Sequence, residues 1–303
     1  MKPGTIVAPH SNLRTRFALL AAALALLLAA AGAGAIEGPF WKVSGRAGAA
    51  YLLGSVHFGT DAIYPLDRAI EDAFARSDRL AVEVDLQSVD NHALMVWITE
   101  HGAFTDGSSL SDKLPPGTWK LLRRRADQFQ VPVGAFAFQR PWLAAFSMTA
   151  LALTRNGFRE ELGIDRHFLL RASGKKPVVE LESVQEQMGL LAGLPPEVEA
   201  HFLHMTLEDL EDGQDAFERL FKAWKSGDAG AIEAQTDEMR RGPYGQVLYS
   251  RLIEERNEKM ALRISELLED GGTTFVVVGA AHLVGHNGVA ARLGSLGYRV
   301  ERR

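Results

Sequence analysis

The sequence contains no cysteine, which excludes disulfide bonds, thiolate-bound zinc, iron–sulfur centres and a cysteine nucleophile. It also lacks the G-x-G-x-x-G and P-loop motifs that bind nucleotide phosphates. With 47% hydrophobic and 23% charged residues among 303, the composition excludes a disordered chain and indicates a globular protein. Any metal ion in such a protein must therefore be bound by nitrogen and oxygen ligands.

The first 35 residues have the features of a secretory signal peptide. Basic residues precede the apolar run of residues 17–31, and residues 33–35 read Ala-Gly-Ala, which resembles a signal peptidase site. We therefore expect export through the inner membrane and a periplasmic location. The alternative is an N-terminal membrane anchor that is not cleaved, because the apolar run extended to residue 35 is long enough to span a bilayer.

The remaining chain, residues 36–303, is acidic. It carries 30 lysines and arginines against 38 aspartates and glutamates, a net charge of −8. This balance disfavours nucleic acid and anionic lipid as partners. We expect a peptide or small-molecule substrate instead, with membrane contact only through an uncleaved N-terminal segment.

Strand-like runs lie at both ends of residues 36–303, and the middle is mostly helical. Two runs flank a glycine turn as in a hairpin, and a third follows a helix at the spacing of a βαβ crossover, which predicts parallel strands. The predicted strands are residues 41–44, 50–53, 80–84, 178–181, 274–278 and 298–300. We therefore predict a single α/β domain with a mixed, mainly parallel central sheet formed by the N- and C-terminal segments. A large helical insertion, about residues 91–270, is interrupted by a strand near residues 177–182.

The motif Gly-x-x-His follows a predicted strand twice, and the histidines are His57 and His282. Ligands of parallel sheets bind outside the carboxyl ends of the strands, and both motifs lie at such ends. Acidic residues end two further strands: Glu83 with Asp85, and Glu180 with Glu182. These carboxylates either end their strands in solvent or face a shared cleft with the histidines.

If the strand ends converge, His57, His282, Glu83 and Glu182 form a cluster of imidazoles and carboxylates. Such a donor set suits Zn, Mn or Co better than Ca or Cu(I). A metal centre of this kind with a spare carboxylate as general base is typical of hydrolysis.

Other polar residues are weaker candidates for a site. Ser55 lacks the G-x-S-x-G context of a serine esterase, and His201 with His204 is interpreted as structural. Arg256 and Asn257 lie in a charged helical segment, which by itself indicates a ladder of surface charges. An arginine also offers a planar fork for a carboxylate or a carbonyl, so both interpretations stay open.

The motifs together resemble those of the TraB/GumN family, whose animal relatives are the Tiki metalloproteases. The resemblance covers most of residues 36–303, and the order of the motifs is more specific than any one of them. They are residues 41–43, 51–59, 83–85, 163–165, 176–177, 181–182, 255–257, 260, 279–285 and 297–301.

This resemblance implies a fold similar to erythromycin esterase and the ChaN-type haem-binding proteins. It also implies a metal-dependent hydrolase, peptidase-like, with a divalent Mn, Co or Zn ion. His57 and His282 would be metal ligands, with Glu182 as a further candidate ligand. Glu83 would be the base or a further ligand, and the Arg256–Asn257 pair would orient substrate or an oxyanion.

Two alternatives to a peptidase stay open. Bacterial GumN-type members are associated with polysaccharide gene clusters, so one alternative is a non-catalytic periplasmic binding or accessory protein for haem, peptide or polysaccharide. The other is an enzyme that hydrolyses a non-peptide ester or lactone. Likeness of fold alone does not decide between these functions.

Overall fold

The computed structural model describes residues 37–211 and 213–303, so the predicted signal segment lies outside the described residues. Within the described residues, no helix combines the length and the apolar character that a membrane span needs. Six strands of this part of the chain form one sheet, in the order β4-β3-β5-β2-β1-β6. The strands are β1 (Phe40–Ser44), β2 (Gly48–Ser55), β3 (Arg79–Val82), β4 (Val178–Glu180), β5 (Gly272–Gly279) and β6 (Arg299–Arg302).

The sheet is mixed and mainly parallel. Strands β4, β3, β5 and β2 run parallel to one another, whereas β1 pairs antiparallel with both β2 and β6. The predicted α/β class and the sheet built from both ends of the chain are confirmed. The crossover spacing does not predict one feature of the strand order: β5, from the C-terminal segment, lies between β2 and β3.

Strands β2 and β5 bring the two Gly-x-x-His motifs side by side. Their register pairs Gly48 with Gly272 and Ser55 with Gly279, so both strands end at the same level. The two histidines follow within three residues of these ends. The two copies of the motif therefore occupy equivalent positions in the fold, each at the carboxyl end of a strand and at the same level of the sheet.

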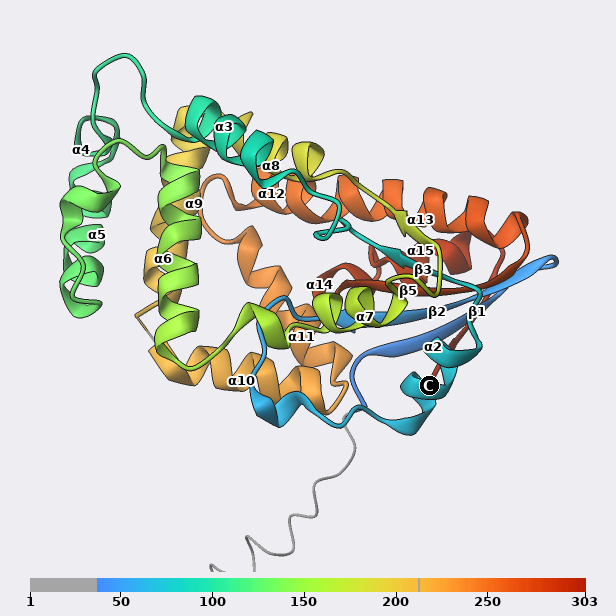
Figure 1. The fold of residues 1–303 in the computed structure, drawn as a ribbon. Coiled ribbons are helices and arrows are strands. Elements are labelled where there is room, and N and C mark those ends of the chain that lie inside the picture. The colour runs from blue at the N-terminus through green and yellow to red at the C-terminus, as the bar shows by residue number, and fades with distance from the viewer. Residues whose placement is uncertain (1–36, 212) are drawn as a thin grey trace, which may run out of the picture. The chain divides into compact units, whose positions relative to one another are not determined.

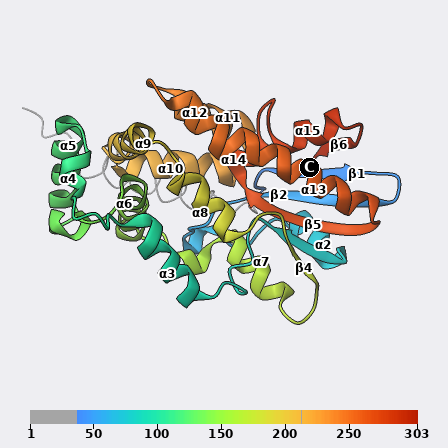
Figure 2. The same ribbon diagram turned by 90° about the horizontal axis from the view of Figure 1, so that it is seen from above.

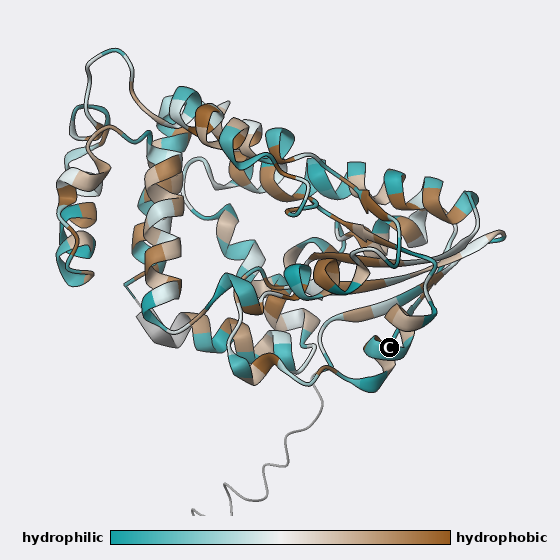
Figure 3. Ribbon diagram, in the orientation of Figure 1, coloured by the Kyte–Doolittle hydropathy of each residue, from teal (hydrophilic) through white to brown (hydrophobic). Residues whose placement is uncertain are grey.

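Helices cover both faces of the sheet (Figure 1). Helices α13 (Glu255–Glu269) and α15 (Val289–Ser295) pack on one face, and α2 (Arg68–Arg76) and α7 (Ile164–Ala172) pack on the other. Figure 3 shows the hydrophobic residues of α13 turned toward the strands and the hydrophilic ones turned away. This amphipathic pattern fixes which side of α13 meets the sheet, and with it the position of the helix's first turn.

The other helices belong mostly to the predicted insertion. Figure 2 shows α4, α5, α6 and α9 together, beyond the sheet. They have a hydrophobic core of their own, which includes Leu122, Met148 and Leu203. Apart from α7 and α13, the helices that the structure describes between β3 and β5 are α3 (Asn91–Gly102), α4 (Leu110–Lys113), α5 (Pro116–Gln128), α6 (Pro141–Arg155), α8 (Val184–Ala192), α9 (Pro196–Asp209), α10 (Gly213–Lys225), α11 (Ala229–Asp237) and α12 (Gly245–Tyr249). One further short helix, α14 (Ala280–Leu283), follows β5 directly.

Short helical turns complete the elements. Within residues 37–211 and 213–303, four of them are 3-10 turns, and η5, just before α13, is a π-helical turn. They are η1 (Asp61–Ile63), η2 (Val133–Phe136), η3 (Glu160–Leu162), η4 (Glu238–Arg240) and η5 (Ser250–Glu254). Single π turns inside helices occur often at functional sites. Here η5 leads directly into the turn of α13 that carries Arg256 and Asn257.

Candidate functional site

Two buried glutamates meet at the carboxyl ends of β3 and β4. The backbone pairing continues past both strands, because the N–H of Glu182 donates to the carbonyl oxygen of Glu83 at 2.9 Å. Glu83 is 5% exposed and Glu182 is 8% exposed. These two residues therefore do not end their strands in solvent, and two carboxylates this deeply buried require positively charged partners.

Arg256 supplies that partner from the first turn of α13. Its Nη2 donates to Oε2 of Glu83 and to Oε2 of Glu182, each at 2.7 Å, and its Nε donates to both oxygens of Glu182. The remaining nitrogen, Nη1, donates to the carbonyl oxygen of Leu252 at 3.3 Å. The surface ladder that the charged segment favoured is wrong for Arg256, because its side chain is only 15% exposed and bridges the two carboxylates.

Glu83 is held by two further donors. The amide Nε2 of Gln187, on α8, donates to Glu83 at 2.9 Å and to Glu182 at 3.0 Å. The backbone N–H of Gly279 donates to Oε1 of Glu83 at 2.5 Å. Burial alone would raise the pKa of the Glu83 carboxyl, but the neighbouring His282 and Arg256 outweigh burial and lower the pKa to about 2.

His282 lies in α14, at the carboxyl end of β5. It is 5% exposed, and its Nδ1 lies 2.6 Å from Oδ1 of Asn257, a residue of α13 that is fully buried. Burial disfavours the charged ring and lowers the pKa of His282 to about 4. The imidazole is therefore neutral at neutral pH.

His57 follows β2 and differs from His282 in both exposure and charge. Its side chain is 58% exposed, and its Nδ1 lies 3.0 Å from Oδ2 of Asp165. The negative charge of Asp165 raises the pKa of His57 to about 9. At neutral pH this ring carries a proton that His282 lacks.

The side chains of Glu83 and His282 lie close to the backbone of Gly279, where an added Cβ atom would contact both. Such an atom would lie 3.2 Å from Oε1 of Glu83 and 3.5 Å from Cδ2 of His282. The carboxylate and the imidazole therefore flank the same backbone position, where only a glycine leaves both undisturbed. Three adjacent parallel strands, β3, β5 and β2, thus present Glu83, His282 and His57 at one edge of the sheet.

The comparisons with known proteins agree with these motifs. The profile of the TraB/PrgY/gumN family matches residues 39–302. The chain belongs to the TraB/PrgY/gumN family. Its relatives include the uncharacterized protein YbaP of Escherichia coli K12 and that of Shigella flexneri, each 26% identical over 80% of this chain and 87% of the relative. An uncharacterized protein of Treponema pallidum is 20% identical over 84% of this chain and 79% of its own length. No solved structure matches this chain.

The family assignment does not by itself place a metal ion. Among the described residues, no three histidine, aspartate or glutamate side chains are arranged to hold one. Both oxygens of Glu182 accept hydrogen bonds from Arg256. The ligand set of His57, His282 and Glu182 thus stays a prediction.

Three of the polar groups around the site were not predicted as site residues. Asp165 belongs to the Gly-Ile-Asp motif at residues 163–165, whose only signal in the sequence is its part in the family resemblance. Gln187 and Asn287 had no signal in the sequence. Asn287 contributes to the site because its carbonyl oxygen accepts a hydrogen bond from Nδ2 of Asn257 at 2.9 Å.

Two other acidic residues end their strands outside the cluster. Glu180 is exposed, and its Oε1 accepts a hydrogen bond from the backbone N–H of Asp85 at 2.8 Å. Asp85 in turn accepts from the N–H of Gln87, as in a turn. For this pair the interpretation as simple strand terminators is correct.

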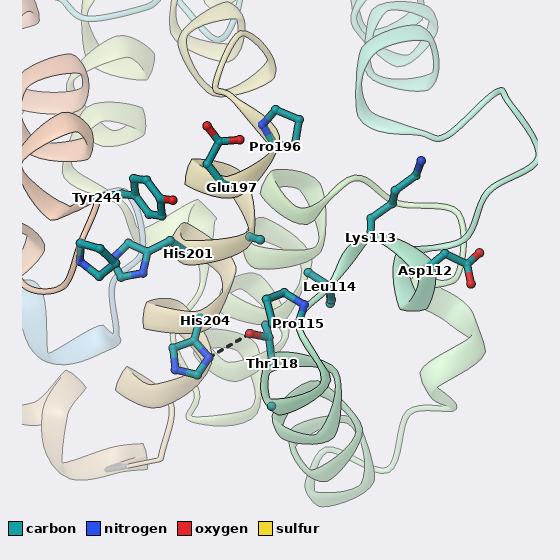
Figure 4. A pocket seen from close by; sticks show the side chains of 13 residues that line it. Asp112, Lys113, Leu114, Pro115, Thr118, Pro196, Glu197, His201, His204 and Tyr244 are labelled. Atoms are coloured by element: carbon teal, nitrogen blue, oxygen red, sulfur yellow. Dashed lines mark hydrogen bonds between the residues drawn. The ribbon is translucent and has the colours of Figure 1, made fainter.

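A separate groove of about 760 Å³ shares no lining residue with this cluster. Figure 4 shows its histidines on α9, with His204 hydrogen-bonded to Thr118. That distance is 3.1 Å, and Nε2 of His201 lies 3.2 Å from the carbonyl oxygen of Arg241. Both rings thus join neighbouring segments, which agrees with the structural role predicted for them.

Proposed function

We propose that this protein is a hydrolase that acts with a divalent metal ion at the carboxyl ends of β2, β3 and β5. One observation carries the proposal: an unprotonated, buried glutamate, a neutral histidine and a protonated histidine follow the ends of three adjacent strands, β3, β5 and β2. Groups whose environments push their pKa values apart in this way cluster at catalytic sites.

The two imidazole rings supply nitrogen donors of the kind that Mn, Co and Zn ions prefer. The Nδ1 of each ring lies against an oxygen, of Asp165 for His57 and of Asn257 for His282. This leaves Nε2 of neutral His282 with a lone pair, and Nε2 of His57 gains one when its ring gives up the proton that it carries at neutral pH. Such outer partners are the rule for metal-bound histidines. We propose His57 and His282 as ligands, together with a carboxylate from Glu83 or Glu182.

A metal ion bound there would supply Lewis-acid chemistry for hydrolysis. The chain's own residues supply the rest. Glu83 stays unprotonated at neutral pH and is able to accept a proton. Arg256 and Gln187 hold the two carboxylates at a fixed separation, and Asn257 holds the ring of His282.

We further propose that the substrate is a peptide and that the protein acts in the periplasm. The support for export is the predicted signal segment, and the support for a peptide is the resemblance to the Tiki metalloproteases. Binding of haem, peptide or polysaccharide without catalysis, and hydrolysis of a non-peptide ester, are the competing functions. An assay of hydrolysis separates them.

The assay is hydrolysis of a peptide library and of an ester and lactone panel by the purified protein with Mn²⁺, Co²⁺ or Zn²⁺. Glu83→Gln is the site variant, and Glu180→Gln, which changes an exposed glutamate at the end of β4, is the matched control. We expect peptide cleavage that falls about 10²- to 10⁴-fold in Glu83→Gln and is unchanged in Glu180→Gln. Cleavage of esters alone would assign the non-peptide reaction. No hydrolysis of any substrate under any metal condition would refute the proposal.

A further inference from the structure

Asp165 joins the end of strand β2 to the histidine that follows it. Its side chain is 9% exposed, and each carboxylate oxygen has its own partner. Oδ1 accepts a hydrogen bond from Oγ of Ser55 at 2.8 Å, and Oδ2 lies 3.0 Å from Nδ1 of His57. The carboxylate cannot rotate without losing one of these two contacts.

The backbone around Asp165 is built for this contact. The N–H of Ile164 donates to the carbonyl oxygen of Val56 at 3.0 Å, so α7 begins directly against the loop that carries His57. A Cβ at Gly163 would overlap the carbonyl oxygen of His57, so only glycine permits this approach. Asp165, in the first turn of α7, is thereby held beside the ring.

His57 depends on this contact more than His282 depends on its own. The ring of His282 is enclosed by the protein, whereas the side chain of His57 is 58% exposed. An exposed ring exchanges between side-chain rotamers unless a hydrogen bond holds it in one of them. A carboxylate that accepts from Nδ1–H fixes both the orientation of the ring and its tautomer.

We propose that Asp165, held in place by Ser55, is the positioning residue for His57. It keeps the hydrogen of the neutral ring on Nδ1 and so reserves the lone pair of Nε2 for the metal ion. The part that concerns the metal ion rests on the proposed function. The part that concerns the tautomer does not.

The test compares wild type with Asp165→Ala and Ser55→Ala in the full chain. The first measurement uses long-range ¹H–¹⁵N NMR on protein freed of metal by a chelator, above the His57 pKa of about 9. We expect neutral His57 to carry its hydrogen on Nδ1 in wild type and to become a mixture of tautomers in Asp165→Ala. The tautomer of His282, which Asn257 holds, is the internal control and should not change.

The second measurement is the Kd for Zn²⁺ by competition with a chelator. We expect affinity to fall about 10- to 100-fold in Asp165→Ala and by a smaller factor in Ser55→Ala, which keeps the carboxylate but not its anchor. An unchanged His57 tautomer in folded Asp165→Ala would overturn the proposal. If Asp165→Ala does not fold, Ser55→Ala decides, and unchanged Zn²⁺ affinity together with an unchanged tautomer would overturn it. Wild type that binds no Zn²⁺ would refute the proposed function, while the tautomer still decides the role of Asp165.

Discussion

The Nδ1 of His282 donates a hydrogen bond to Oδ1 of Asn257 at 2.6 Å. The direction follows from the other end of the amide, because Nδ2 of Asn257 donates to the carbonyl oxygen of Asn287 at 2.9 Å and so turns Oδ1 toward the ring. The neutral imidazole then has its lone pair on Nε2. One buried amide thus decides which nitrogen of His282 is available to a ligand.

We expect Asn257→Ala to damage both stability and metal binding. The change leaves the buried ring of His282 without its hydrogen-bond partner, which costs about 1–3 kcal/mol, whereas the carbonyl oxygen of Asn287 keeps its hydrogen bond from Nε of Arg292. It also frees the ring of His282, which should weaken Zn²⁺ binding about 10- to 100-fold. Urea denaturation and chelator competition measure the two effects. An unchanged Zn²⁺ Kd in the folded variant would show that the amide does not orient a ligand.

Removal of Arg256 should destabilise the protein strongly. Arg256→Met leaves Glu83 and Glu182 buried side by side without their shared cation, and breaking a buried ion pair costs about 3–5 kcal/mol. Arg263→Met is the matched control on the same helix, because its side chain is 49% exposed and pairs with the exposed Glu266. The control should cost less than about 1 kcal/mol in denaturant unfolding. Equal losses in both variants would contradict the bridging role of Arg256.

The lowered pKa of Glu83 predicts a pH dependence of stability. In the folded protein the carboxyl stays charged down to about pH 2, whereas the unfolded chain takes up the proton near its ordinary value of 4.5. The stabilisation is therefore complete above about pH 4.5 and is lost as the pH falls toward 2. The difference in unfolding free energy between wild type and Glu83→Gln should narrow over this range, by roughly 3 kcal/mol at most. A difference that does not vary with pH would contradict the lowered pKa.

Gly279→Ala tests how tightly the site is built. The new Cβ would lie 3.2 Å from Oε1 of Glu83 and 3.5 Å from the ring of His282, so the carboxylate must shift by a few tenths of an ångström. We expect hydrolysis to fall on the order of tenfold while the fold persists. Gly134→Ala is the control, because a Cβ there has no heavy atom within 4 Å. Equal activity of the two variants would mean that this spacing does not matter.

The sequence predicts the strand ends well because the signal is local. Apolar runs and glycine turns mark where each strand stops, and the residues just after them are the site candidates. These candidates are His57, Glu83, Glu182 and His282. The register of β2 against β5 then places both histidines at the same level. The four positions depend only on where each strand stops.

The contacts between elements could not be predicted in the same way. Arg256 and Asn257 look like surface residues by helical spacing, but α13 packs against the sheet and buries both near the strand ends. Asp165 and Gln187 reach the site from helices whose placement depends on the order of the strands. That order follows from packing of distant segments, which local patterns do not encode.

Metal content tests the central claim most directly. Elemental analysis would compare the purified wild-type protein with the double variant His57→Ala, His282→Ala. The control is His201→Ala, His204→Ala, which removes two histidines of the separate groove. We predict about one Mn, Co or Zn ion per chain in wild type and control, and none in the site variant. Folded wild type without metal under every loading condition, or equal metal in all three proteins, would contradict a metal site at the strand ends.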